Sequence, residues 1–300
     1  MHGFGHARPA ALTITATPPN LAGELPGDLS EQVSRALRED VGSGDVTARL
    51  IEADAAARAR VLCRDGAVIC GTAWFDETFR QLDPAVQVRW LRRDGDAVEP
   101  GTLLCELAGP ARALLTGERT ALNFLQLLSG TATLTARYVA AVSGTGCHIL
   151  DTRKTLPGLR TAQKFAVRCG GGQNHRFGLY DRVLVKENHI AAAGSIEAAV
   201  GNARRLSPGL LVEVEAEDLA EVAQALAARC DIILVDNFPL ANLREAVKLN
   251  RAAAHPAKVE ASGGVTLDRV AAIAATGVDF ISIGGLTKHV QAVDLSMRLV

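Results

Sequence analysis

The 300-residue chain has little net charge and no long apolar run. Its formal net charge is −1, with 48% hydrophobic and 22% charged residues. No stretch approaches the roughly 18 apolar residues of a membrane span, and near-neutrality argues against general nucleic-acid binding, which needs a basic face. The opening MHGFGHARPAALTITATPPN lacks the apolar core of a secretory signal. We therefore expect a cytoplasmic globular protein with neither nucleic acid nor membrane as a partner.

The chain contains cysteines, but their spacing matches no disulfide or metal-binding motif. The six have no CxxC pattern and no Cys/His metal spacing, so we expect reduced, mostly buried thiols. Walker A, GxSxG and HExxH motifs and a GxGxxG opening a helix are also missing. Nucleotide hydrolysis, dinucleotide binding, serine-hydrolase and zinc-protease chemistry therefore have no support.

The first half of the chain predicts a tail and an α+β domain. Residues 1–26 are rich in Pro, Gly, Thr and Ala without periodicity, which predicts a flexible tail. Asp28 is placed to cap a helix over 29–39. The domain, 27–142, combines short strands, a second helix and a long linking helix that is apolar on one side and interrupted at 129–130. Its expected strands are 59–63, 67–70, 86–91 and 103–107, and its other helices are 74–82 and 112–142.

From Cys147 onward, strand and helix patterns alternate. Six βα units with continuously apolar strands predict a parallel sheet covered by helices. Because eight units close a full barrel, we expect an incomplete TIM-like α/β barrel over 143–286, with a doubly wound open sheet as the alternative. Residues 287–300 should return to the first domain. The expected strands are 148–151, 183–186, 211–215, 231–236, 258–262 and 279–283, and the helices are 159–169, 195–205, 217–229, 240–251 and 267–276.

Polar groups follow every one of these strands. Ligands of parallel α/β folds bind at the carboxyl ends of the strands, so a polar set on all six strands predicts a site there. The segment from Asp151 to Asn188 holds eight basic and three acidic residues, which favours a small multiply charged anion. Its candidate ligands for two carboxylates are Arg153, Lys154, His175, Arg176 and Lys186. We interpret Arg160, Lys164 and Arg168 as a solvated helix face.

Two acids and two glycine pairs complete the predicted site. Glu215 and Asp236 close their strands, and buried acids need cations or a metal, here Mg²⁺ bound directly or through water. Alternation places Glu213 on the same side as Glu215. Bare backbone N–H groups after the last barrel strands commonly bind phosphate. The candidates are Ser262, Gly263 and Gly264 and the group Ile283, Gly284 and Gly285.

At these residues the chain closely resembles quinolinate phosphoribosyltransferase, also called carboxylating nicotinate-nucleotide pyrophosphorylase. The matching blocks are GERTALNFLQLLSGTAT, DTRKTLPGLR, GGGQNHRFGLYDRVLVKENHI, VEVEAE, DIILVDNF, EASGGV and FISIGGLT. The resemblance implies an N-terminal α+β sandwich domain, an incomplete α/β barrel and a homodimer. It also implies that quinolinate, phosphoribosyl pyrophosphate and Mg²⁺ give nicotinate mononucleotide, pyrophosphate and CO₂ in NAD biosynthesis.

The resemblance also assigns roles to single residues. Lys154, Lys186, Glu215 and Asp236 match catalytic positions, and the two acids face ribose and metal-pyrophosphate. Arg119 would enter the partner subunit's barrel, although helix geometry alone equally allows a solvated arginine. The implied substrate-binding set is Arg119, Thr152, Arg153, Lys154, His175, Arg176, Lys186, Glu215, Asp236, Ser262, Gly263, Gly264, Ile283, Gly284 and Gly285.

Three other functions remain open at this point. A Schiff-base lyase would use Lys186 as its nucleophile. A molybdenum-transport-associated paralogue of the fold shares a DTRKT-like block, but we expect it to lack the lysine of VLVKENH. Nicotinate phosphoribosyltransferase takes a monocarboxylate, whereas the density of cations here favours a dicarboxylate.

Overall fold

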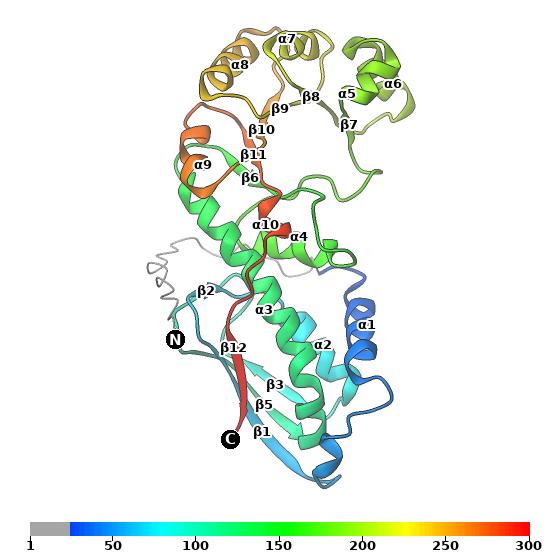
Figure 1. Cartoon of the computed structure of the whole chain (residues 1–300), viewed down its shortest axis with the longest axis vertical. Helices are drawn as coiled ribbons and strands as arrows, with labels where there is room; N and C mark the ends of the chain where they lie inside the picture. The colour runs from blue at the N-terminus through cyan, green and yellow to red at the C-terminus, as the bar shows by residue number, and fades with distance from the viewer. Residues whose placement is uncertain (1–24) are drawn as a thin grey trace, which may run out of the picture.

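The computed structural model describes residues 25–300 as two lobes joined by one long helix, α3 (Ala111–Ala141) (Figure 1). Most of the expected tail, residues 1–24, lies outside the described residues. The expected boundaries at 26/27, 142/143 and 286/287 stay predictions. Within residues 25–300, no helix has both the length and the apolar character needed to cross a membrane.

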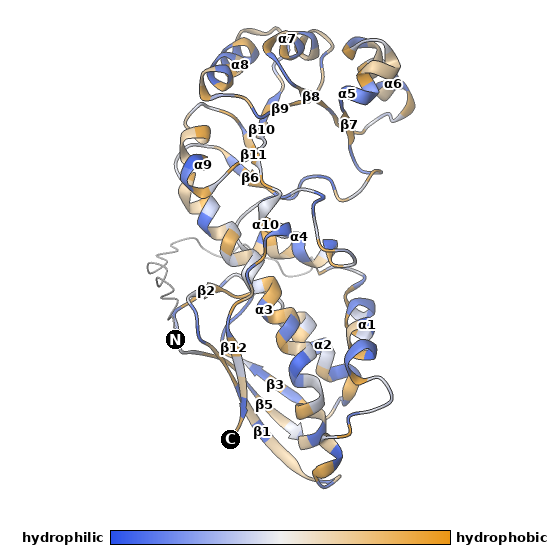
Figure 2. Cartoon of the chain, viewed as in Figure 1, coloured by the Kyte–Doolittle hydropathy of each residue, from blue (hydrophilic) through white to orange (hydrophobic). Residues whose placement is uncertain are grey.

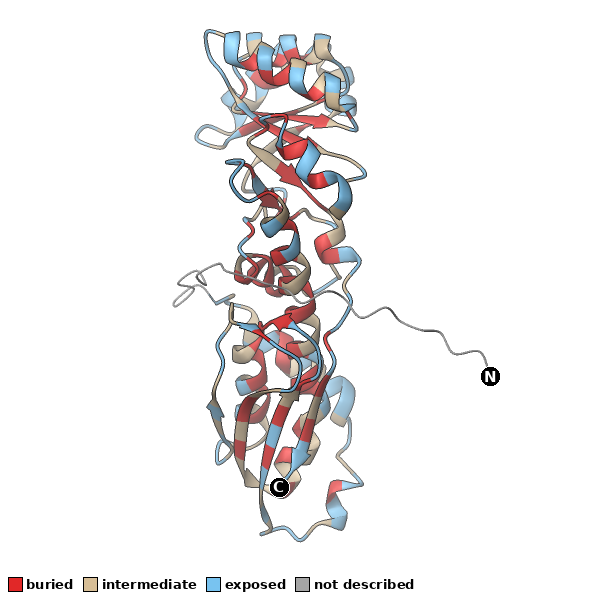
Figure 3. Ribbon diagram, turned by 90° about the vertical axis from the view of Figure 1, so that its left-hand side faces the viewer, coloured by how far each residue is buried: buried red, intermediate tan, exposed pale blue. Residues whose placement is uncertain are grey.

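The first lobe is a four-stranded antiparallel sheet covered on one side by helices. The strand order is β12-β1-β5-β3. Buried and exposed residues alternate along β1, so one sheet face meets the core and the other meets solvent (Figure 3). The core includes Val61, Leu104, Phe75 and Leu114. The elements before α3 are α1 (Leu29–Val41), a 3-10 turn (Ala48–Leu50), β1 (Ala56–Cys63), β2 (Ala67–Val68), α2 (Thr72–Leu82), β3 (Gln87–Trp90), β4 (Ala97–Val98) and β5 (Thr102–Pro110).

The C-terminal segment returns to this lobe, as expected. Its strand β12 (Leu295–Leu299) pairs antiparallel with β1, placing Met297 opposite Val61. On its way it passes very close to α3. A Cβ atom on Gly130 would lie 2.2 Å from the carbonyl oxygen of Gln291. The helix is continuous through Gly130, so the expected interruption was wrong: the glycine serves close packing and does not break the helix.

The second lobe is a six-stranded parallel sheet whose order is β6-β11-β10-β9-β8-β7. Helices α6 to α9 lie on its outer side (Figure 1), and hydrophilic and hydrophobic residues mix along α7 and α8, as in helices with one face on a sheet (Figure 2). Its elements are β6 (His148–Leu150), α4 (Arg160–Cys169), β7 (Val183–Val185), α5 (Glu187–Ala193), α6 (Ile196–Leu206), β8 (Val212–Ala216), α7 (Leu219–Ala227), β9 (Ile232–Asp236), α8 (Leu240–Ala252), β10 (Lys258–Ser262), α9 (Leu267–Ala274), β11 (Phe280–Ser282) and α10 (Gly285–Lys288).

The strand order is that of an incomplete barrel. The first strand of the lobe, β6, pairs in parallel with the last, β11, as it does when a barrel closes. The first and second strands, β6 and β7, form the two edges of the sheet and leave an opening between them. The segment carrying α4 connects these two edges. The doubly wound alternative was wrong, because helices α6 to α9 cover a single side (Figure 1).

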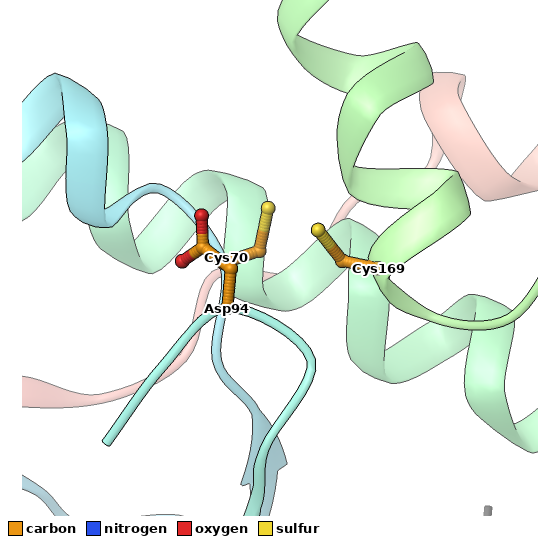
Figure 4. A group of neighbouring side chains, drawn as sticks. All are labelled: Cys70, Asp94 and Cys169. Atoms are coloured by element: carbon orange, nitrogen blue, oxygen red, sulfur yellow. The ribbon is translucent and has the colours of Figure 1, made fainter. Parts of the chain in front are cut away.

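The two lobes meet at a small buried group. Cys70, just after β2, and Cys169, at the end of α4, point their sulfur atoms toward one another, beside the carboxylate of Asp94 (Figure 4). All six cysteines are free, and all are buried, as expected. Asp28 also joins the lobes. It holds the N-cap position of α1, but its carboxylate accepts hydrogen bonds from Thr161 of α4 instead of capping the helix.

Candidate active site

Two adjoining cavities lie at the carboxyl ends of the barrel strands. The smaller has a volume of about 330 Å³ and the larger about 650 Å³. They share five lining residues: Thr152, Lys154, Asp236, Ser262 and Ser282. A ligand can therefore extend from one cavity into the other.

The smaller cavity collects the cations expected to bind carboxylates. Arg153, His175, Arg176 and Lys186 line it, together with the shared Lys154. The pKa of Arg176 is lowered, first by burial and then by the nearby Arg153 guanidinium. The buried Nε of Arg153 has no hydrogen-bond partner within residues 25–300. Crowded cations with an unsatisfied N–H group are typical of an anion site.

A buried ion pair supports this wall of the cavity. Asp151, at the end of β6, bonds with Lys164 of α4, and neither side chain is exposed. Asp151 also accepts the backbone N–H of His175 at 2.9 Å, while Lys164 donates to the carbonyl of His175 at 3.0 Å. Burial raises the pKa of Asp151 and lowers that of Lys164, and their mutual attraction opposes both shifts. The pair therefore holds the backbone of a cavity residue from both sides.

The expected solvated helix face was wrong for Lys164. Its side chain turns inward because the neighbouring strand ends in a buried carboxylate. Arg160 is also engaged, since it donates to the carbonyl of Phe177 at 3.0 Å. Helical periodicity could not reveal either contact, because both partners lie outside α4.

Buried acidic side chains inside the barrel contact the side chain of His175. Its Nε2 lies 2.9 Å from Glu213 Oε2 and 3.7 Å from Glu260 Oε2. Arg182 contacts the same Glu213 carboxylate at 3.3 Å. The three groups His175, Glu213 and Glu260 are all buried. This contact fixes the orientation of the imidazole ring relative to the cavity.

Both expected metal-binding acids line the smaller cavity. Glu215 forms an ion pair with Lys186 that is only partly exposed to solvent. Asp236 accepts a hydrogen bond of 2.7 Å from the side-chain amide of Asn237. Two carboxylates facing one cavity beside phosphate-type loops fit the oxygen ligands that Mg²⁺ prefers.

The larger cavity contains both expected phosphate loops. Ser262, Gly263, Gly264, Ile283, Gly284 and Gly285 all line it. Gly263 has a φ of +95°, and a Cβ there would lie 2.2 Å from the side-chain oxygen of Asn237. Glycine is needed for both reasons, and it leaves the backbone bare toward the cavity.

Arg119 does not reach either cavity of its own chain. Its side chain is exposed on α3, whereas Leu134 of the same helix lines the larger cavity. Fifteen residues of helix place the two about 22 Å apart along the axis. The other fourteen residues of the expected set line one or both cavities.

Three residues of the site were missed. Lys164 and Asn237 act through contacts that only the folded chain creates. The sequence could have identified Glu260, because strand alternation places it on the same side as Ser262, two residues later. Glu213 was expected on the side of Glu215, and it lies inside the barrel beneath the cavity.

Fold and site together define an anion-binding α/β-barrel enzyme with one place for carboxylates and another for phosphates. The family model for the C-terminal domain of quinolinate phosphoribosyl transferase matches residues 131–298, and that for the N-terminal domain matches residues 45–129. The chain therefore belongs to the quinolinate phosphoribosyltransferase family.

Individual relatives agree with this membership. The chain is 44% identical over 260 residues to a probable carboxylating nicotinate-nucleotide pyrophosphorylase of Bacillus subtilis, covering 86% of this chain and 89% of that protein. It is also 44% identical over 265 residues to one from Synechocystis, covering 88% and 90%. The nicotinate-nucleotide pyrophosphorylase structure from Francisella tularensis is 45% identical, with a TM-score of 0.89 over 92% of this chain and 98% of that one.

Proposed function

We propose that this chain is a decarboxylating quinolinate phosphoribosyltransferase of NAD biosynthesis. It joins quinolinate to phosphoribosyl pyrophosphate and forms nicotinate mononucleotide, pyrophosphate and CO₂. The observation that carries the proposal is the continuity of the two cavities through Thr152, Lys154, Asp236, Ser262 and Ser282. A pyridine dicarboxylate in the smaller cavity can meet a ribose whose phosphates occupy the larger one.

The first step is the departure of pyrophosphate from C1 of the ribose. Lys154 lines both cavities and is placed to offset the growing negative charge. The ribose becomes oxocarbenium-like, and the carboxylates of Glu215 and Asp236 stabilise that positive charge. The same two acids would hold Mg²⁺, directly or through water, and the bound ion would neutralise pyrophosphate oxygens.

The second step is attack by the pyridine nitrogen. The cations of the smaller cavity hold the two carboxylates so that the nitrogen faces C1, which is an effect of orientation. The ring nitrogen then carries a positive charge. This charge stabilises the electron pair that stays on the ring carbon when the adjacent carboxylate departs as CO₂.

The surroundings of Lys186 argue against the three alternative functions. A Schiff-base lyase needs a free amine, whereas this lysine binds a carboxylate. We expect the molybdenum-transport-associated paralogue to lack this lysine, whereas Lys186 is present here and lines the cavity. Several cations around one small cavity suit two carboxylates better than the single one of nicotinate.

We further propose a homodimer in which Arg119 completes the partner's site. Two observations support this proposal: Arg119 is exposed far from its own cavities, and the barrel is open between β6 and β7. The free buried thiols fit a reducing compartment such as the cytoplasm.

A direct assay tests the proposed function. Purified protein is supplied with quinolinate, phosphoribosyl pyrophosphate and Mg²⁺, and CO₂ and the mononucleotide are measured. Nicotinate replaces quinolinate in a parallel reaction. Product from quinolinate with CO₂ release supports the proposal, while turnover of nicotinate alone contradicts it.

A further inference from the structure

The proposed reaction requires a proton that neither substrate supplies. When CO₂ leaves the pyridine ring, the bond between the ring carbon and the carboxyl carbon breaks. Its electron pair stays on the ring carbon, which must then bind a proton to give nicotinate mononucleotide. An acid in the smaller cavity is the natural source, and the inference that follows rests on the proposed function.

Three acidic side chains line this cavity, and two of them make close contacts with a partner. Glu215 pairs with Lys186, and Asp236 accepts a hydrogen bond from Asn237. The third, Glu260, is fully buried on β10. Within residues 25–300 neither of its carboxyl oxygens makes a hydrogen bond of good geometry. A buried carboxyl group without such a hydrogen bond is favoured as the neutral acid.

The surroundings of Glu260 favour the protonated form. Burial, and then the carboxylate of Glu213 on β8, raise the pKa of Glu260 to about 7. His175, Ser282 and Arg182 face the same group and oppose the shift. The opposition is limited because His175 lies 2.9 Å from Glu213 but 3.7 Å from Glu260. His175 and Arg182 both make their close contacts with Glu213, which leaves Glu260 as the acid that keeps its proton.

We propose that Glu260 is the catalytic acid that protonates the ring carbon after CO₂ departs. The carboxyl O–H bond of Glu260 breaks, and its proton joins the electron pair left on carbon. Glu260 becomes a carboxylate that faces His175 and Arg182, and the emptied cavity lets a proton return from solvent after the product leaves. While the ligand fills the cavity, the buried Glu260 is out of contact with bulk water, so the carbanion receives its proton from the protein.

The test separates the two chemical steps in a single turnover. Glu260→Gln keeps the size and neutrality of the acid but removes its proton. Without a proton donor the carbanion recombines with the CO₂ still in the cavity, so net CO₂ release slows. We expect pyrophosphate to form within about threefold of the wild-type rate, while CO₂ and mononucleotide form about 100-fold more slowly, a typical contribution of a general acid. The undecarboxylated nucleotide should accumulate. Binding of benzene-1,2-dicarboxylate, a nonreacting analogue, should stay within about threefold, since binding uses the cations.

The pH dependence gives an independent readout. In the wild type, the rate of CO₂ release should fall as pH rises through about 7, because Glu260 loses its proton. Glu260→Asp, which retains an acid, should keep such a decline, and Glu260→Gln should lack it. If Glu260→Gln does not fold, the Glu260→Asp profile decides: no decline overturns the inference.

Other outcomes are equally decisive. If pyrophosphate and CO₂ formation slow together in Glu260→Gln, or if neither slows, Glu260 is not the proton donor. If the wild-type protein releases no CO₂ from quinolinate, the proposed function itself fails, and that result is distinguishable because it precedes any substitution.

Discussion

Lys164 and Asp151 form an ion pair from which water is completely excluded, and both hydrogen-bond the backbone of His175. One partner comes from a helix and the other from a strand end, so the pair joins two elements beside the cavity. Removing one charge leaves the other buried without compensation, which is costly.

Replacing Lys164 should therefore destabilise the protein strongly. We expect Lys164→Met to lower the free energy of unfolding by about 3–5 kcal/mol, measured by denaturant titration. Asp151→Asn combined with Lys164→Met should recover part of the loss. Lys248→Met is the matched control, because Lys248 forms an exposed pair with Glu245 and should change stability by less than about 0.5 kcal/mol. A loss below about 1 kcal/mol for Lys164→Met would contradict the interpretation.

Lys186 should matter for turnover more than for stability. Lys186→Met removes a cation from the carboxylate cavity and leaves Glu215 without its partner. We expect kcat/KM for quinolinate to fall at least about 100-fold while Tm changes little. Lys258→Met, which removes an exposed pair with Asp279 away from both cavities, should stay near wild type. Near-wild-type turnover of Lys186→Met would exclude the proposed role.

Hybrid dimers test the shared site. Arg119→Ala and Lys186→Ala proteins should each be inactive, but an equal mixture that exchanges subunits forms mixed dimers with one intact site. Random assembly should restore about a quarter of wild-type activity, because half the dimers are hybrid and each carries one working site of two. Light scattering of each variant should give the mass of a dimer. Absence of any recovery, with exchange verified, counts against a site shared between subunits.

Gly263 should matter for substrate binding as well as for the left-handed backbone conformation at this position. Gly263→Ala places a methyl group against Asn237 and should raise KM for phosphoribosyl pyrophosphate at least about tenfold. Gly209→Ala is the matched control: its φ of +88° carries similar strain, but nothing lies within 4 Å of the added atom. Backbone strain should cost both variants about 1 kcal/mol of stability, and the contact with Asn237 should add to the loss in Gly263→Ala. If Gly263→Ala and Gly209→Ala have equal KM values for phosphoribosyl pyrophosphate, the loop at Gly263 does not bind its phosphates.

Asp94, at the junction of the lobes, should make stability depend on pH. Burial raises its pKa from 3.8 to about 6. Between these values the folded protein keeps a proton that the unfolded chain releases, so rising pH lowers stability through this window and the effect levels off above it. Asp94→Asn should flatten the Tm profile between pH 4 and 6 and raise Tm at pH 7, while exposed Asp54→Asn should leave the profile unchanged. An unchanged profile in Asp94→Asn would disprove the assignment.

The alternation of apolar strands with amphipathic helices determined the βα units, because both periods are local properties of the chain. The polar residue at each strand end placed Lys186, Glu215 and Asp236 correctly for the same reason: parallel strands end at one edge. Helix periodicity also located α3, but not its continuity through Gly130, which depends on the segment that crosses it.

The sequence by itself determined the order of elements and the chemical groups carried to one edge of the sheet. Only the tertiary structure decided that Lys164 turns inward to Asp151 and that the two cavities share lining residues. It also decided that His175 lies closer to Glu213 than to Glu260, whose oxygens make no hydrogen bond of good geometry within residues 25–300. These contacts join residues that are distant in the chain. Their burial sets the electrostatic energy of each charge, and burial cannot be predicted from the local sequence pattern.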